Sequence, residues 1–208
     1  MVMYTDLSIY YGGCKMERFI SAIRKSVDDS NWMSAMCLAI TMPDICGGIE
    51  WPGDRNNSER FKKWFNQNLK IHYDPENNYE SLMSARPNIL EEFSGNPYAL
   101  ESFEKLKFEP VAEHVRLNAD DFWKLRCKLL HDGHGQVRKG KNIIPSPKPE
   151  EGYSIHKAFM GGLFYIQVDI FCEDMCIAVD SWYNKKVVGS RSFEKRIDKL
   201  IKITPFPI

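Results

Sequence analysis

The chain has 208 residues, and its 28 Lys and Arg residues balance 28 Asp and Glu residues, so its formal net charge is zero. Hydrophobic residues make up 43% and charged residues 27%, which excludes an intrinsically disordered, fibrous or supercharged protein. A chain of this length buries roughly 70% of its unfolded surface, so its stability needs neither a disulfide nor a structural metal. We expect one domain over residues 1–208.

The first 70 residues contain three segments with the apolar spacing of amphipathic helices. The first spans about residues 15–27. The second begins after Ser30, a possible N-cap, and we expect Pro43 to interrupt it. Three glycines between residues 44 and 53 then indicate a break, and Ser58 offers the N-cap of the third helix.

The middle of the chain is acidic and rich in helix-breaking residues. Residues 74–121 contain eleven acidic and four basic residues, a net charge of −7. Prolines and glycines recur between residues 73 and 110, and only residues 98–107 have a helical pattern. We therefore expect an irregular acidic insertion over about residues 73–117.

The last 90 residues contain two strong helices. The first begins at Asn118, a capping residue followed by carboxylates, and ends at Asp132 and Gly133. Residues 142–149 have three prolines and suit an edge strand or an extended loop. A second apolar helix covers about residues 168–183, and the tail over residues 185–208 is basic.

Taken together, these patterns predict an all-α fold, a bundle of four or five helices with little strand. No apolar stretch reaches the roughly 20 residues that span a bilayer, so we expect no membrane association. The six cysteines form no Cys-x-x-Cys pair, and the N-terminus lacks the pattern of a secretory signal. These features favour a cytoplasmic protein.

Arg126 is the anomaly of the helix that begins at Asn118. With Phe122 set to 0°, Arg126 falls at about 40° and lies among the apolar residues of the helix. A guanidinium on a buried face needs a carboxylate, a phosphate or an interface, since burying it unpaired is costly. His131 lies about 140° round and roughly 7.5 Å along the axis. The two heads can meet at one ligand if His131 swings over the helix end, or if a second subunit supplies half of the site.

The string LRCKLLHDG at residues 125–133 resembles the motif of the HEPN superfamily, in which an arginine, four residues and a histidine lie near a helix C-terminus. Residues 143–182 also look like a group of uncharacterised bacterial proteins related loosely to that superfamily. One position departs from the pattern, because members with nuclease activity often have a polar residue after the arginine and this chain has Cys127.

The resemblance implies a HEPN-like bundle that forms a homodimer and cleaves RNA in a shared cleft without a metal ion or other cofactor. Arg126 would hold the scissile phosphate, and His131 would transfer protons to or from the ribose 2′-hydroxyl or the leaving oxygen. Both roles suit the chemistry of the two side chains. The function implied is an endoribonuclease of the toxin or defence kind, with an antitoxin as a possible further partner.

Other interpretations of these residues remain open. Arg126 could pair with a carboxylate such as Glu17 or Asp174, while His131 caps the helix, in a non-catalytic interaction or nucleic-acid-binding module. His131, His134 and His156 could be considered as metal ligands, but no cysteine or carboxylate falls at a recognisable ligand spacing, so we predict no metal site.

The charge distribution supports a nucleic-acid partner. Residues 123–141 contain six basic residues and one acidic residue, and residues 185–202 contain seven and two. The alternative is an ordinary solvated charged face. The side chains we expect to contact nucleic acid around the pair are Lys124, Lys128, His134, Arg138, Lys139 and Lys141.

Overall fold

The computed structural model describes residues 15–138, 141–150 and 154–201. Its α-helices are α1 (Glu17–Asp28), α2 (Trp32–Glu50), α3 (Asn57–Asn68), α4 (Lys70–Tyr73), α5 (Asn78–Ala85), α6 (Ile89–Glu92), α7 (Pro97–Lys105), α8 (Ala119–His131), α9 (Val168–Trp182) and α10 (Arg191–Ile197). Two 3-10 turns, η2 (Leu106–Phe108) and η3 (Glu113–Val115), and one π-helical turn, η4 (Tyr183–Val187), complete the helical elements of this part of the chain. The strands are β1 (Gln136–Arg138), β2 (Lys141–Ser146), β3 (Ala158–Met160) and β4 (Leu163–Gln167).

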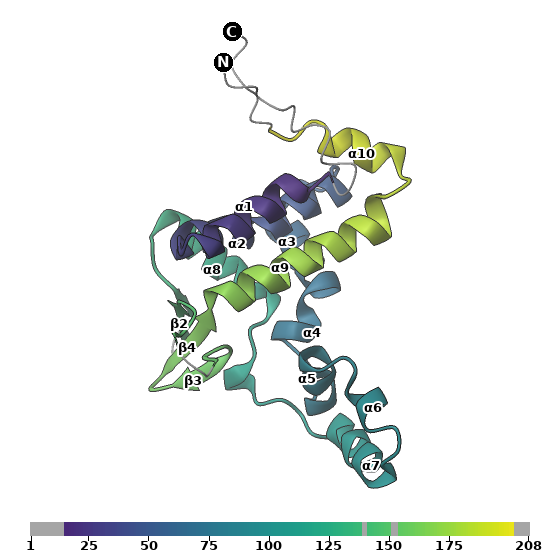
Figure 1. Ribbon diagram of the computed structural model, residues 1–208. Helices are drawn as coiled ribbons and strands as arrows, with labels where there is room; N and C mark the ends of the chain where they lie inside the picture. The colour runs from purple at the N-terminus through teal and green to yellow at the C-terminus, as the bar shows by residue number, and fades with distance from the viewer. Residues whose placement is uncertain (1–14, 139–140, 151–153, 202–208) are drawn as a thin grey trace, which may run out of the picture.

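The body of the protein is a bundle of α1, α2, α3, α8 and α9 (Figure 1). Aromatic rings fill its centre, where Trp64 meets Trp182 edge to face and Phe122 packs against Phe65 and Phe171. Each of these rings is at most 1% exposed. Burial of this apolar surface is the main source of the bundle's stability.

Helix α2 is longer than the sequence indicated. It runs for 19 residues through Pro43 and the glycine pair, so the predicted interruption and break are wrong. Close packing against α3 explains why residue 47 is a glycine, because a Cβ on Gly47 would lie 2.9 Å from the carbonyl oxygen of Arg60. The N-cap is Asn31, the residue after Ser30. By length and composition α2 could cross a membrane, but half of its apolar window is buried in the bundle, as in a core helix.

A four-stranded mixed sheet corrects the all-α prediction. The strand order is β1-β2-β4-β3, with β2 parallel to β4 and the two outer pairs antiparallel. The fold is therefore α/β, not an all-α HEPN-like bundle with little strand. Strand β2 lies inside the sheet, although its Pro145 suggested an edge, and Gly161 and Gly162 turn β3 into β4 with φ of 59° and 80°.

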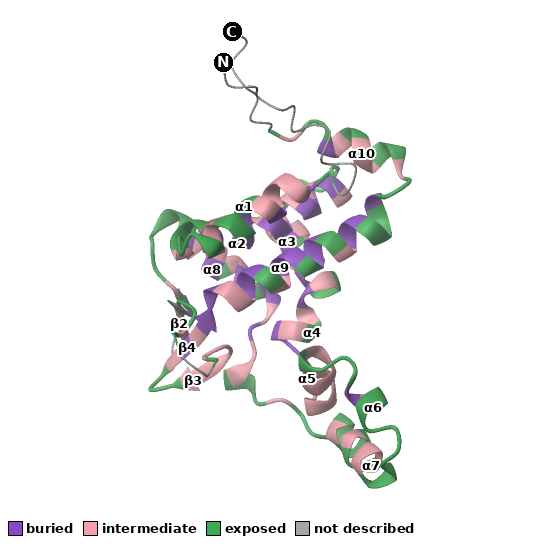
Figure 2. Cartoon of the chain, in the orientation of Figure 1, coloured by how far each residue is buried: buried purple, intermediate pink, exposed green. Residues whose placement is uncertain are grey.

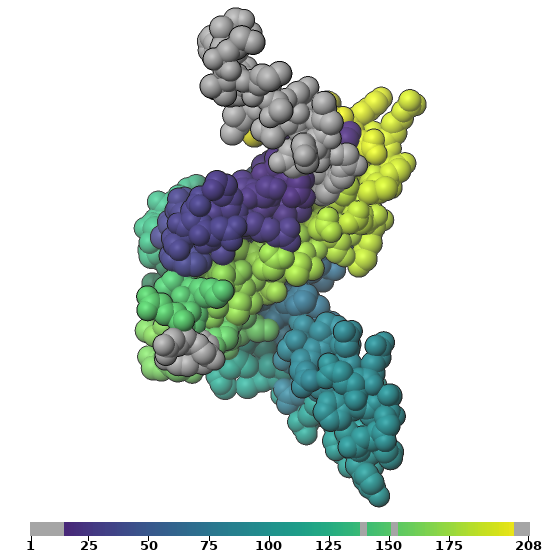
Figure 3. All heavy atoms as spheres, viewed as in Figure 1, coloured from purple at the N-terminus to yellow at the C-terminus, as the bar shows by residue number. Residues whose placement is uncertain are grey.

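The acidic insertion is helical, and it projects from the body as an arm (Figures 1 and 3). Helices α5 and α7 begin at asparagine N-caps, Asn77 and Asn96. The capping side chains start a new helix after each proline break, so the arm is helical and not irregular. Between residues 77 and 116 only Ile89 is buried, and Tyr98 and Phe108 are more than 80% exposed (Figure 2). The arm therefore has almost no core of its own.

The predicted helices on either side of the sheet are confirmed. The Asn118 side chain accepts a hydrogen bond from the Asp121 backbone N–H at 2.9 Å, and α8 ends at His131 before Gly133, whose φ is 69°. Helix α9 covers almost the expected range, and the basic tail forms the short helix α10.

Candidate functional site

Arg126 pairs with a carboxylate of its own chain. Its Nε donates to the Asp44 carboxylate on α2 at 2.6 Å, and both side chains are partly buried, 23% and 20% exposed. The guanidinium carbon lies 5.4 Å from the centre of the Trp123 ring, within cation–π range. The sequence predicted a carboxylate, a phosphate or an interface as the partner of Arg126. The partner is a carboxylate, but it is that of Asp44 and not that of Glu17 or Asp174. Of the two we named, Glu17 bonds Ser21 and Asp174 bonds Tyr73.

The pair with Asp44 fixes the plane of the guanidinium. Burial raises the pKa of Asp44, and the charges of Arg126 and Arg60 act in the opposite direction. The terminal nitrogens of Arg126 make no hydrogen bond with any residue that the structure describes. A carboxylate that holds Nε and leaves the terminal nitrogens unbonded pre-orients an arginine for an anion.

His131 lies in the exposed last turn of α8 and makes no hydrogen bond within the described part of the chain. Because α8 is continuous between Arg126 and His131, the two residues stay about 140° apart around the axis. The structure therefore does not bring them together on one side of the helix. Beyond His131, Asp132 accepts a hydrogen bond from Lys128 at 2.6 Å, and the His134 ring lies 3.7 Å away.

The six residues predicted to contact nucleic acid have different surroundings. Lys124 and His134 are exposed, and Lys128 is partly buried and paired with Asp132. Nothing is described for the side chain of Arg138 or for Lys139, which lies outside the described residues. Among the described residues, Lys124 and Lys128 on α8 and His134 just beyond its end remain of the predicted basic surface.

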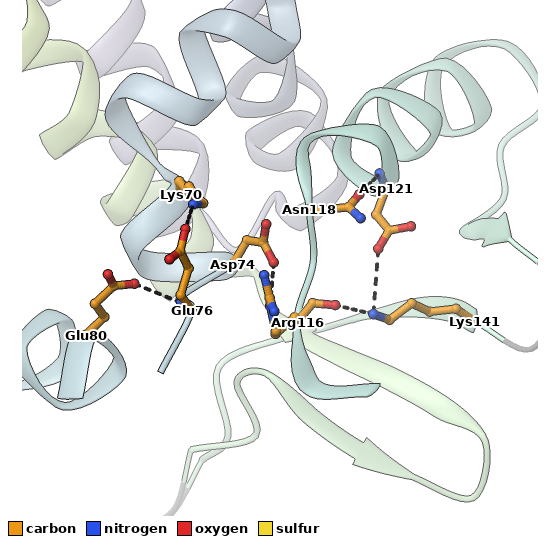
Figure 4. Close-up of polar contacts among 8 residues, drawn as sticks. All are labelled: Lys70, Asp74, Glu76, Glu80, Arg116, Asn118, Asp121 and Lys141. Carbon is orange, nitrogen blue, oxygen red and sulfur yellow. Dashed lines mark hydrogen bonds and ion pairs between the residues drawn. The ribbon is translucent and has the colours of Figure 1, made fainter. Parts of the chain in front are cut away.

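Lys141 is the exception, and its assignment to a nucleic-acid surface is wrong. The side chain is 5% exposed, its Nζ donates to the Arg116 carbonyl, and it lies 3.6 Å from the carboxylate of Asp121 (Figure 4). Asp121 is 2% exposed, so the pair is buried between β2 and α8. Arg116 also bonds Asp74 at 2.6 Å, which ties the base of the arm to the body.

A second group of titratable side chains surrounds Asp174 on α9, and sequence reasoning missed it as a site. The Tyr73 hydroxyl donates to Asp174 Oδ2 at 2.8 Å, and His156 Nε2 lies 3.9 Å from the same oxygen. His72 and Lys157 act on Asp174 electrostatically, and both lower its pKa while burial raises it. Two histidines, a lysine and a tyrosine therefore face one carboxylate.

Lys157 has an unusual backbone. Its φ of 56° lies in the left-handed region, which costs a non-glycine residue about 1–2 kcal/mol. Its Nζ donates to the His72 carbonyl at 2.8 Å. Burial lowers the pKa of Lys157, and Asp174 opposes this shift. A strained residue whose charged group is partly buried is typical of functional sites.

The two histidines of this group differ in their contacts. His72 Nδ1 lies 2.7 Å from Ser84 Oγ on α5. Burial lowers the pKa of His72, while Asp174 raises it and Lys157 lowers it. Burial lowers the pKa of His156 to about 4, and neither of its ring nitrogens makes a hydrogen bond of normal geometry with the residues that the structure describes. His72 is therefore the histidine that is bonded to a possible nucleophile.

The sequence carries little signal for this group. Its members come from α4, α5, the segment before β3, and α9, so no local spacing links them. We had considered His156 as a metal ligand and Asp174 as a partner of Arg126, each for a different reason. Only the pairing of distant elements reveals the common site.

Among the described residues, no group of three or more His, Cys, Asp or Glu side chains is placed to hold a metal ion. Comparisons of the chain with protein-family models, with curated proteins and with solved structures find no match. Function must therefore be argued from the two groups of residues above.

Proposed function

We propose that α8 binds RNA through its exposed basic side chains and that two copies of the chain cut the RNA without a metal ion. The protein would then be an endoribonuclease of the toxin or defence kind. The observation that carries the proposal is the orientation of Arg126, which Asp44 holds through Nε while the terminal nitrogens bond no residue in the described part of the chain. A planar guanidinium presented in this way matches two phosphate oxygens.

His131 supplies the proton transfer in this proposal. It is exposed at the C-terminal end of α8, and imidazole is the side chain that most often acts as a general acid or base. Because Arg126 and His131 of one chain lie on different sides of α8, the acid at each phosphate must be His131 of the partner subunit. The homodimer is therefore part of the proposal. Exposed Lys124 and His134 extend the phosphate-binding surface.

The test is RNA cleavage by the purified full-length chain in excess EDTA, followed on an end-labelled single-stranded RNA. The variants are Arg126→Ala and His131→Ala. Arg24→Ala is the matched control, because Arg24 also pairs with a carboxylate, that of Glu173, on a different face. We expect each site variant to lose about 100-fold in rate and the control to keep the wild-type rate.

Two results would separate the proposal from a non-catalytic module. If wild type and both site variants cut RNA at the same residual rate, catalysis by this pair is refuted. If no cleavage occurs but Arg126→Ala and Lys124→Ala weaken RNA affinity, α8 is a binding surface only. Folding of each variant is checked by its thermal unfolding, because Arg126→Ala also removes the partner of Asp44.

A further inference from the structure

Ser84 and His72 are in hydrogen-bond contact as a nucleophile and a base, and the carboxylate of Asp174 acts electrostatically on the base. Ser84 lies near the end of α5, His72 on α4 and Asp174 on α9, so the arm and the body each contribute to the group. We propose that Ser84 Oγ attacks the carbonyl carbon of small carboxylic esters, with His72 as its general base. This activity is independent of the proposed RNA site on α8.

The contact between nucleophile and base has the length that acyl transfer requires. Ser84 Oγ lies 2.7 Å from His72 Nδ1. A serine hydroxyl becomes nucleophilic when a neutral imidazole within about 2.6–3.2 Å accepts its proton. Burial and Lys157 keep the pKa of His72 below its ordinary value, so the ring is neutral at pH 7. When Nδ1 accepts the hydroxyl proton, the ring proton of His72 lies on Nε2.

Asp174 acts on the base electrostatically. Its charge raises the pKa of His72, which means that it stabilises the imidazolium formed when the proton is taken up. The hydrogen bond from Tyr73, whose ring is fully buried against Phe122 and Phe171, holds the carboxylate in place. Asp174 is therefore a positioning residue, acting through His72.

Lys157 supplies the positive charge that an acyl-transfer site needs. Its Nζ is anchored on the His72 carbonyl at 2.8 Å, and its charge reaches the ring of His72. In the reaction this ammonium stabilises the oxyanion that develops on the ester carbonyl oxygen.

The reaction needs only the ester and water. Ser84 Oγ forms a bond to the acyl carbon as its proton passes to His72, and the bond from that carbon to the alcohol oxygen breaks as His72 protonates the leaving alcohol. Water then attacks the acyl-serine, gives one proton to His72, and releases the carboxylic acid as His72 returns the proton to Ser84 Oγ. Ser84, His72 and Lys157 are all partly exposed, so a small ester reaches them from solvent.

The test uses a fluorophosphonate probe, which phosphonylates activated serines, on the full-length protein with mass spectrometry to locate the adduct. Ser81→Ala is the matched control, because Ser81 lies one turn earlier on α5. We expect one adduct, on Ser84, in wild type and in Ser81→Ala, and none in Ser84→Ala. His72→Asn should label about 100-fold more slowly, and Asp174→Asn should also slow labelling, with part of the rate restored in Asp174→Glu.

Absence of an adduct on Ser84, under conditions that label a known serine hydrolase, would overturn the proposal. So would labelling of His72→Asn at the wild-type rate, because the serine would then not depend on the base. Thermal unfolding shows whether each variant is folded, and Ser84→Ala, which removes one oxygen, keeps the test valid if His72→Asn unfolds. Arg126→Ala should label as wild type, so failure of the RNA proposal leaves this result unaffected.

Discussion

Replacement of Lys141 with Met removes the cation of the buried pair between β2 and α8. Lys141 and Asp121 lie 3.6 Å apart and are 5% and 2% exposed, so solvent screens their interaction weakly. At an effective dielectric constant of about 20, two unit charges at this distance attract by about 5 kcal/mol. Loss of one partner from a buried pair typically costs about 3–5 kcal/mol, because the remaining charge is left in the interior. We expect a loss of that size in the free energy of unfolding.

The assay is urea unfolding followed by tryptophan fluorescence, with thermal unfolding as a second measurement. The melting temperature should fall by about 6–20 °C for a chain of this length. Lys124→Met, an exposed lysine on α8, is the control and should change the stability by less than about 0.5 kcal/mol. The double variant Lys141→Met with Asp121→Leu should recover most of the loss, because both charges of this pair are then removed.

The same variants separate a structural lysine from a ligand-binding one. In folded protein, Lys141→Met should keep the wild-type affinity for RNA, while Lys124→Met should bind RNA more weakly. The reasoning is refuted if Lys141→Met costs less than about 1 kcal/mol, or if it weakens RNA binding without loss of stability.

Three further predictions concern the fold. Gly47→Ala should destabilise the protein by about 1–3 kcal/mol, since its Cβ would press on the Arg60 carbonyl. Gly48→Ala has open space around it and should stabilise the protein by up to about 1 kcal/mol. Equal effects of the two variants on urea unfolding would contradict this packing. Asn118→Ala should cost about 1 kcal/mol by the loss of the α8 cap, and an unchanged urea midpoint would exclude that role. His156 has a folded-state pKa of about 4, below its unfolded value, so its contribution is complete above about pH 6.5 and is lost as the pH falls toward 4. His156→Phe should flatten the stability curve over this window by up to about 3 kcal/mol, and parallel curves for the two proteins would be inconsistent with a buried neutral histidine.

Local signals in the sequence were enough to locate most of the helices. The cap at Asn118 and the positive-φ glycine at Gly133 define both ends of α8 through interactions within a few residues. Apolar spacing likewise located α1, α3 and α9. These features depend on neighbours in the chain, so they can be predicted without tertiary structure.

The failures in α2 and in the sheet involve contacts between distant segments. Pro43 and Gly47 have low helix propensity, but packing of α2 in the bundle overrides it. Strands β3 and β4 are short, and β4 leads directly into α9, so the apolar pattern of the helix hides them. The parallel pairing of β2 with β4 has no local signature, and without it the sheet could not be predicted.

In the candidate sites, too, the sequence predicted local features but not the contacts between distant segments. The position of Arg126 on a buried face followed from helical periodicity, but its partner lies 82 residues earlier on α2. Lys141 was assigned to a basic surface from the net charge of residues 123–141, and a net charge contains no information on burial. The group around Asp174 joins residues up to about 100 positions apart, as in its bond with Tyr73, so only the fold could reveal it.

The most direct test of the proposed function is complementation between two inactive variants. Arg126→Ala and His131→Ala are unfolded, mixed and refolded together, and RNA cleavage is measured in EDTA beside each variant alone. If each site takes Arg126 from one subunit and His131 from the other, half of the dimers regain one of two sites, and the mixture recovers about a quarter of the wild-type rate. A mixture as inactive as its components, from refolded protein of wild-type stability, would contradict a site shared between two copies of α8.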